Sequence, residues 1–187
     1  YVSTDSDSIA ACCKKAGVKV PDRRSDELAT DAARSVDVVL NAIERAESRA
    51  GSFDFVALLQ PTSPLREPGR WLDAFRLIGD ESCNAVVGVS PARHHPFHAL
   101  HYDADRVLRP WGSTENLTIR SQELPPVVVV NGSLYLVRTD KLPCSRTFFP
   151  SPTRGVLCSN PGESMDIDTE ADWFAGEALG AHFGYSL

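Results

Sequence analysis

Asp166 and Asp168 stand two residues apart in the segment SMDIDTEADW, residues 164–173. In an extended backbone, residues two apart point to the same side, so both carboxylates would face one way. Two such carboxylates repel each other unless a cation lies between them, and Mg²⁺ carried by a nucleotide is the expected occupant. The spacing therefore predicts that Asp166 and Asp168 are catalytic residues that hold a metal ion.

A structural reading of the same segment stays open. Thr169 and Asp172 fit a capping box for the closing helix, and Asp168 could serve only that cap. The cap leaves Asp166 unexplained. An aspartate pair of this kind also occurs in acid-phosphatase-like hydrolases, but those enzymes place it after their first strand, whereas this pair lies near the end of the chain.

The segment LLQPTSPLR, residues 58–66, is the second candidate for chemistry. It ends an apolar run, and ligands of open α/β sheets bind beyond the carboxyl ends of strands. The Gln60 amide can both donate and accept a hydrogen bond, and the Arg66 guanidinium is a charged fork suited to carboxylate or phosphate. The alternative is a loop stiffened by prolines whose polar side chains only face water.

Two other segments have strong structural readings. Asn131-Gly132 between the apolar runs of VVVVNGSLYLV is the usual signal for a tight hairpin turn. The histidines of RHHPFHALH, residues 93–101, could bind zinc, but no cysteine or carboxylate lies near them and Pro96 breaks helical spacing. We favour a polar loop that faces the substrate.

The elements that must position these residues alternate between helix and strand. We expect helices that begin at Ser6 or Asp7, at Thr30 or Asp31, at Pro68 and after Thr169. We expect strands at residues 18–20, 55–59, 84–90 and 164–168, and apolar runs around residues 131–132. In the third helix, Trp71, Phe75 and Ile78 should face the core. The alternation predicts an α/β fold of three layers, with a mainly parallel sheet and helices on both faces.

Composition narrows the function. The chain has 187 residues, 42% hydrophobic and 24% charged, which suits one globular domain. Its net charge of −6 and scattered basic residues argue against binding of nucleic acid. No apolar run is long enough to span a membrane, so no membrane association is predicted. Five cysteines without metal-site spacing are read as reduced thiols of a cytoplasmic protein.

Taken in order, these motifs resemble the acylneuraminate cytidylyltransferases, also called CMP-sialic acid synthetases. The matching segments are STDSDSIA, RRSDELATDAARS, LLQPTSPLR, RHHPF, SQELPPVVVVNGSLYL, TFFP and SMDIDTEADW. The resemblance implies a fold like that of nucleotide-diphospho-sugar transferases over residues 1–187. It also implies that the hydroxyl of a nonulosonic acid of sialic, legionaminic or pseudaminic type attacks CTP, with Mg²⁺ as cofactor, to give the CMP-sugar and pyrophosphate.

The resemblance also assigns roles to individual residues. Arg24, with Ser35 as a companion, is similar to the arginine of the nucleotide site. Gln60 resembles the residue that contacts the sugar acid, and Asn131 and Tyr135 match a segment that lines the sugar pocket, so a turn at Asn131 could exist and still present its side chain.

A further pair of residues concerns the oligomer. Phe148 and Phe149 match an aromatic pair that projects from a dimerisation excursion, residues about 139–156 here, into the neighbouring subunit's site. The active form would then be a homodimer. The local alternative is that both are core phenylalanines.

Some positions depart from the family pattern. The family begins with a strand and an R-x-G-S-K loop that cradles the triphosphate, and neither precedes Tyr1, so we expect that the sequence is a fragment. His98 stands where sialic-acid enzymes carry lysine, Val129 where they carry arginine, and Arg120 lies one place from an expected basic residue. These changes surround the sugar pocket and suggest a nonulosonic acid other than ordinary sialic acid.

Other functions stay open. The chain could be an inactive relative that binds nucleotide or protein partners, or a nucleotidyltransferase for the eight-carbon lipopolysaccharide sugar. Cytosine and another base cannot be distinguished from these residues alone.

Overall fold

The computed structural model describes residues 1–185. The chain divides into two compact units. Unit 1 contains Tyr1–Leu59, Trp71–Val87 and Leu134–Arg154, and unit 2 contains Gln60–Arg70, Gly88–Ser133 and Gly155–Leu187.

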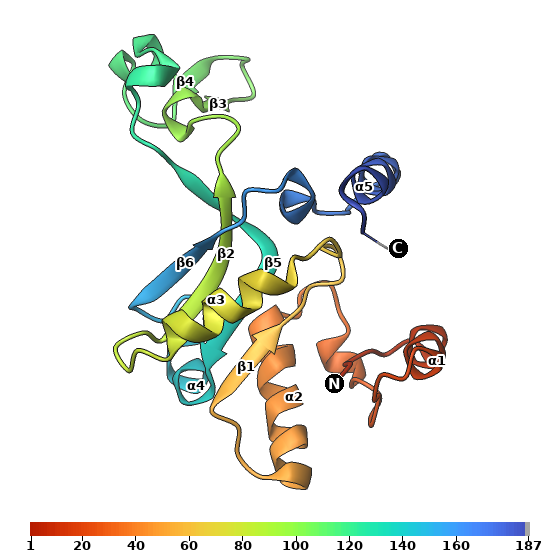
Figure 1. Cartoon of the computed structure of the whole chain (residues 1–187). Helices are drawn as coiled ribbons and strands as arrows, with labels where there is room; N and C mark the ends of the chain where they lie inside the picture. The colour runs from red at the N-terminus through yellow and green to blue at the C-terminus, as the bar shows by residue number, and fades with distance from the viewer. Residues whose placement is uncertain (186–187) are drawn as a thin grey trace. The chain divides into compact units, whose positions relative to one another are not determined.

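The main sheet has four strands in the order β1-β5-β2-β6 (Figure 1). These strands are β1 (Phe55–Leu58), β2 (Ala85–Pro91), β5 (Val128–Arg138) and β6 (Thr153–Leu157). β1 runs antiparallel to β5, from Phe55 opposite Arg138 to Leu58 opposite Tyr135. A mainly parallel sheet was expected, and the observed sheet contains at least this one antiparallel pair. An antiparallel strand in an otherwise parallel sheet is common in α/β folds. A separate ribbon pairs β3 (Leu100–Tyr102) with β4 (Leu108–Pro110).

The helices largely follow their sequence signals. They are α1 (Asp7–Lys15), α2 (Ser35–Ala50), α3 (Pro68–Ile78), α4 (Leu142–Ser145) and α5 (Glu170–Phe183). The Ser6 hydroxyl accepts from the Ile9 amide and caps α1, as predicted. Pro68 opens α3, where its missing N–H costs nothing. α2 begins at Ser35, which is five or four residues after the expected start at Thr30 or Asp31, and its N-cap is Arg34.

The core of unit 1 lies between α2 and the sheet. Val36 and Val39 of α2 pack in one cluster with Ala85 of β2 and Val137 of β5. Since side chains alternate along a strand, Val86 and Leu136 point to the opposite face, and Figure 1 shows α3 lying across that face. Helices therefore cover both faces, which gives the predicted three layers.

Three local predictions were wrong. Residues 18–20 have no regular secondary structure. In the segment 164–168, Ser164 ends a helical turn and the residues after it have no regular secondary structure, so neither segment is a strand. Phe75 is 50% exposed, because Ala74 and Ile78 are the residues of α3 that face the core.

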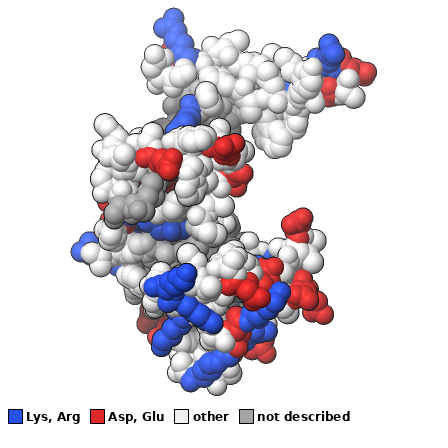
Figure 2. Space-filling model, turned by 90° about the vertical axis from the view of Figure 1, so that its right-hand side faces the viewer, with Lys and Arg blue, Asp and Glu red and all other residues white. Residues whose placement is uncertain are grey.

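Charge is mixed on the surface. Figure 2 shows Lys and Arg side chains interspersed with Asp and Glu on the drawn face. Within residues 1–185, no helix has the length and apolar character needed to cross a membrane.

Candidate functional site

The loop that follows β1 is held by Arg66. The Arg66 Nε donates to the Ser133 carbonyl over 2.9 Å, and Nη2 donates to the Gln60 carbonyl. Burial lowers the pKa of this guanidinium. Two of its nitrogens thus fix the loop and the neighbouring strand, and the predicted contact of Arg66 with an anionic substrate stays a prediction.

Asn131 is held inside the protein by a small polar network. The side chain is 8% exposed, and its Nδ2 donates to Ser90 Oγ over 2.9 Å. Its Oδ1 accepts from the Ser133 hydroxyl over 2.8 Å and from the Ser133 amide over 3.1 Å. Ser90 Oγ in turn donates to the Cys158 carbonyl. Asn131 therefore fixes the local shape of β5, and its predicted contact with the sugar is untested.

The hairpin predicted at Asn131-Gly132 does not form. β5 runs without a break from Val128 to Arg138, and Gly132 sits within it at a φ of +76°. That left-handed conformation suits glycine and bends the strand without reversing it. A Cβ added to Gly132 would lie 2.6 Å from Ser63 Oγ and 2.9 Å from Gln60 Oε1. The strand thus lies directly against the side chain that we expect to contact the sugar.

Ser63 is a residue that the sequence did not single out. Its hydroxyl is buried and has no hydrogen-bond partner among the described residues. The sequence signal would have been its place between Pro61 and Pro64, which hold it inward beside Gln60.

Asp166 and Asp168 lie on an extended segment that leads into α5. The Ile167 amide between them donates to the Thr62 carbonyl over 2.7 Å, which ties this segment to the loop of Gln60. Both aspartates are exposed and Ile167 is partly buried, the alternation expected of extended chain. This alternation of exposure fits two carboxylates on one side of the segment, and their shared role in binding a metal stays a prediction.

The capping reading is correct for only part of this segment. Thr169 and Asp172 form the capping box of α5, and hydrogen bonds from Thr169 lower the pKa of Asp172. The Asp168 backbone amide also donates to Asp172, over 3.3 Å. No hydrogen bond or ion pair within residues 1–185 occupies the carboxylates of Asp166 and Asp168, so both are free for a ligand.

The donor set fits Mg²⁺. This ion keeps several waters and needs only one or two protein carboxylates when a nucleotide supplies phosphate oxygens. The part of the chain described contains no group of three or more His, Cys, Asp or Glu side chains suited to a metal. A site made by Asp166 and Asp168 alone would therefore be completed by the nucleotide.

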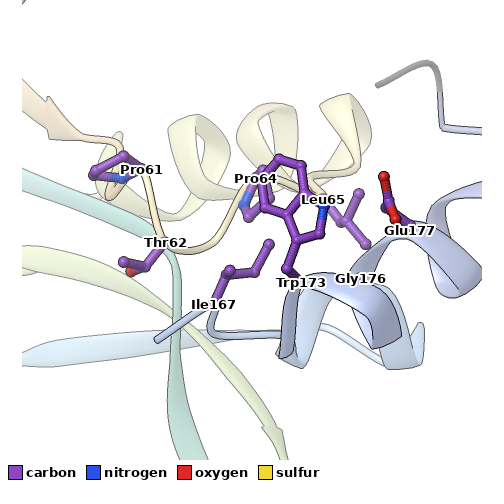
Figure 3. Close-up of a pocket in the computed structure, with 8 residues that line it drawn as sticks. All are labelled: Pro61, Thr62, Pro64, Leu65, Ile167, Trp173, Gly176 and Glu177. Atoms are coloured by element: carbon purple, nitrogen blue, oxygen red, sulfur yellow. The ribbon is translucent and has the colours of Figure 1, made fainter. Parts of the chain in front are cut away.

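A cavity of about 330 Å³ lies on the other side of this segment. Figure 3 shows Ile167 and Trp173 facing the loop residues Pro64 and Leu65 across it, with the Glu177 carboxylate at one end. Its walls are almost wholly apolar, which does not suit a triphosphate. Because Ile167 lines this cavity, the neighbouring aspartates point away from it.

The predicted residues of unit 1 form two groups. Arg24 donates from Nε to Ser3 Oγ over 3.1 Å and from Nη2 to the Ser3 carbonyl, and Ser35 is the first residue of α2. The Tyr135 ring lies 5.5 Å from the Phe148 ring and 6.2 Å from the Phe149 ring, measured between centroids.

The two phenylalanines differ in environment. Phe148 packs against the core cluster of unit 1, as the core alternative holds, whereas Phe149 is 47% exposed. A contact with a second subunit therefore suits Phe149 better than Phe148.

The remaining predicted residues lie in the loops of unit 2. His98 has its Nε2 3.3 Å from the Ile119 carbonyl, and His95 has its Nε2 3.2 Å from the Pro125 carbonyl. Arg120 is exposed. The histidines thus hold a polar loop together, and the substrate-facing role of His98 and Arg120 stays a prediction.

Comparisons with known proteins find relatives along nearly the whole chain. The chain is 34% identical over 178 residues to CMP-N,N'-diacetyllegionaminic acid synthase of Legionella pneumophila, across 95% of this chain and 76% of that protein. It is 28% identical to the protein of the same name in Campylobacter jejuni, across 95% and 75%. It is 30% identical to N-acylneuraminate cytidylyltransferase of Streptococcus agalactiae, across 92% and 40%. No family model matches the chain.

Solved structures agree on the fold. CMP:2-keto-3-deoxy-manno-octonic acid synthetase complexed with CTP superposes with a TM-score of 0.64 at 16% identity, covering 97% of this chain and 80% of that one. 4-Diphosphocytidyl-2C-methyl-D-erythritol synthase of Anaerococcus prevotii superposes with a TM-score of 0.55 at 11% identity, covering 94% and 77%. At these identities the likeness concerns the fold alone, and it confirms the predicted α/β class.

Proposed function

The chain belongs to the acylneuraminate cytidylyltransferase family, and from that premise we propose that it transfers CMP from CTP to a nonulosonic acid and releases pyrophosphate. The substrate to test first is N,N'-diacetyllegionaminic acid, because the relative that is 34% identical carries that activity in its name. The presence of His98 and Val129, in place of a lysine and an arginine, also favours a sugar other than ordinary sialic acid.

One observation carries this proposal within unit 2. The hydrogen bond from the Ile167 amide to the Thr62 carbonyl joins the loop of Gln60 to the segment of Asp166 and Asp168. The Gln60 amide can hydrogen-bond to a sugar hydroxyl, and the two aspartates can hold a metal ion. This backbone hydrogen bond therefore joins the segments that carry them. Transfer of a nucleotidyl group requires this combination, because it depends on positioning and on neutralisation of phosphate charge.

The residues then take the following roles. Asp166 and Asp168 hold Mg²⁺, and Gln60 orients the sugar acid. An ion held by these two carboxylates would supply positive charge beside the phosphates and would favour ionisation of the attacking hydroxyl. The anomeric hydroxyl oxygen of the sugar forms a bond to the α-phosphorus of CTP and loses its proton to solvent, while the bond from that phosphorus to the pyrophosphate oxygen breaks and its electron pair leaves with pyrophosphate. Arg24, with Ser35, contributes to the nucleotide site.

An exposed aromatic side chain and the free cysteines bear on the assembly and the compartment. We infer a homodimer in which the exposed Phe149 reaches the neighbouring subunit. The five free cysteines suit the reducing cytoplasm, where CTP is available.

The test is a pyrophosphate-release assay that crosses the four nucleoside triphosphates with legionaminic, pseudaminic and sialic acids and the eight-carbon lipopolysaccharide sugar. Release with CTP and a nonulosonic acid that depends on Mg²⁺ is the expected result. Activity only with the eight-carbon sugar would replace the proposed substrate. No release with any pair, from folded protein that still binds CTP, would favour the inactive relative.

A further inference from the structure

An ion pair between a buried carboxylate and a partly exposed arginine lies just before the two aspartates. The Glu163 side chain is 1% exposed, and it lies in the single helical turn Pro161–Ser164. Arg70, in the first turn of α3, donates from Nε to Oε1 over 3.0 Å and from Nη2 to Oε2 over 3.1 Å. The contact with Glu163 raises the pKa of the Arg70 guanidinium. The two side chains are therefore aligned as a fork.

Such a pair is a poor way to gain stability alone. A buried carboxylate loses its hydration, and well-packed apolar residues of the same volume would usually serve the fold as well or better. A fork of two parallel hydrogen bonds does fix relative position and orientation closely.

More polar contacts surround the pair. The Asn160 side-chain amide accepts from the Gly162 backbone and donates to Glu67 over 3.2 Å, and the Tyr185 hydroxyl donates to Glu67 over 2.7 Å. The Asn160 backbone amide also donates to Glu163, over 3.4 Å, which closes a capping box. The turn is thus held to the start of α3 from several directions.

The chain between this turn and the metal pair is short. The Met165 amide donates to the Gly162 carbonyl over 3.1 Å, and Asp166 follows at once. The next amide, that of Ile167, is bonded to Thr62. Asp166 is therefore fixed on both sides, by the Arg70–Glu163 pair before it and by Thr62 after it. Both fixed points belong to one stretch of unit 2, residues 60–70.

We propose that the Arg70–Glu163 ion pair is a positioning element that sets Asp166 and Asp168 in place for the divalent ion. The inference rests on the proposed function, because the ion pair can have a positioning role only if Asp166 and Asp168 bind the metal ion. Arg70 and Glu163 touch neither metal nor substrate in this scheme. They act through the backbone that joins Glu163 to Asp166.

The test uses Arg70→Lys, which keeps the charge but loses the fork, and Glu163→Gln, which keeps the shape but loses the charge. Arg76→Lys is the matched control, because Arg76 makes an exposed ion pair with Asp73 on the same helix. Mn²⁺ is the probe, and its binding is measured by electron paramagnetic resonance at fixed CTP without sugar. Circular dichroism at the same temperature selects conditions in which every variant is folded.

We expect Arg70→Lys and Glu163→Gln to need about tenfold more Mn²⁺ for half-saturation, the low end of the effect of losing an outer-shell partner. The Mg²⁺ activation curve of pyrophosphate release should shift by the same factor, whereas Arg76→Lys should match the wild type. A merely structural pair would lower the melting temperature and leave Mn²⁺ half-saturation unchanged.

The outcomes separate the two proposals. Wild-type activity with an unshifted Mn²⁺ curve in folded Arg70→Lys overturns this inference and leaves the proposed function standing. Wild-type protein that binds no Mn²⁺ beyond the amount held by free CTP overturns the metal role and this inference together. Should Glu163→Gln fail to fold, Arg70→Lys still decides the question.

Discussion

The backbone amide of Ile167 donates a 2.7 Å hydrogen bond to the carbonyl oxygen of Thr62. These residues lie in the two segments that the sequence singled out as chemically active, one after β1 and one before α5. The bond fixes the register of the aspartate segment against the loop, and the loop is itself held by the Arg66 contacts with backbone. The first two predictions change one side chain on each side of this bond.

Asp168→Asn keeps the shape of the side chain and removes its negative charge. We expect pyrophosphate release at saturating CTP and Mg²⁺ to fall on the order of 100-fold, the size of losing one preorganised electrostatic contact to a transition state. Circular dichroism should be unchanged, because no contact within residues 1–185 uses this carboxylate. Glu170→Gln, an exposed carboxylate two residues on, is the control and should keep full activity. An Asp168→Asn protein as active as the wild type would remove this residue from the metal site.

Gln60→Ala tests the other side of the bond. Loss of one hydrogen bond of about 1 kcal/mol to the sugar should raise the KM for the nonulosonic acid about fivefold, with little change in the KM for CTP. Steady-state kinetics with each substrate varied in turn distinguishes the two. Equal KM values for the sugar in the variant and the wild type would leave Gln60 as a loop residue only.

The acid stability of unit 1 should depend on Asp80. Its carboxylate accepts from the Ser82 hydroxyl over 2.7 Å and from the Ser82 amide over 2.9 Å, and it pairs with Arg154. These contacts lower the pKa of Asp80 from 3.8 to about 2. A carboxylate whose pKa is lower in the folded state than in the unfolded state stabilises the fold at pH values above its unfolded-state pKa. That stabilisation is lost as the pH falls through its folded-state pKa.

Asp80→Asn should therefore unfold at lower denaturant concentration than the wild type near about pH 6. The difference should shrink between about pH 4 and about pH 2, as the wild-type carboxylate takes up its proton. Urea titrations at several pH values provide the measurement. If the difference in unfolding midpoint between Asp80→Asn and the wild type were the same at every pH, the carboxylate charge of Asp80 would not contribute to stability.

The sequence predicted the helix ends correctly where they depend on interactions between residues only a few positions apart. The Ser6 cap, Pro68 at the start of α3 and the Thr169–Asp172 box each act within a few residues, and each lies where the sequence predicts. Asp166 and Asp168 are both exposed on either side of the partly buried Ile167 even though no strand forms there, because side chains alternate along any extended backbone.

The rest depended on contacts that are distant in sequence. Residues 18–20 have strand-like composition but lack the partners of the main sheet, and the segment only exchanges single contacts such as that of Lys19 with Val2. The Arg70–Glu163 pair joins residues 93 positions apart, so neither residue carries a local signal. Asn131-Gly132 gave a strong hairpin signal that was overruled, because the ladder of β5 continues on both sides of it.

Gly132 shows how closely that continuous strand approaches the loop. Its φ of +76° alone makes alanine unfavourable, and its Cβ would also meet Ser63 Oγ at 2.6 Å and Gln60 Oε1 at 2.9 Å. Gly17 is the matched control, since it has a φ of +78° and a Cβ added there would have nothing within 4 Å. The two substitutions separate backbone strain from steric contact with the loop.

We expect Gly17→Ala to lower the free energy of unfolding by about 1 kcal/mol, from strain alone. Gly132→Ala should lower it by about 3 kcal/mol, and because Gln60 must move, the KM for the sugar should rise as well. Adding Ser63→Ala removes the 2.6 Å contact and leaves Ser63 Cβ at 3.8 Å, an ordinary van der Waals distance. The double variant should therefore recover part of the lost stability, as measured by urea unfolding. If Gly132→Ala and Gly17→Ala lose equal stability and neither changes the sugar KM, the strand does not constrain Gln60.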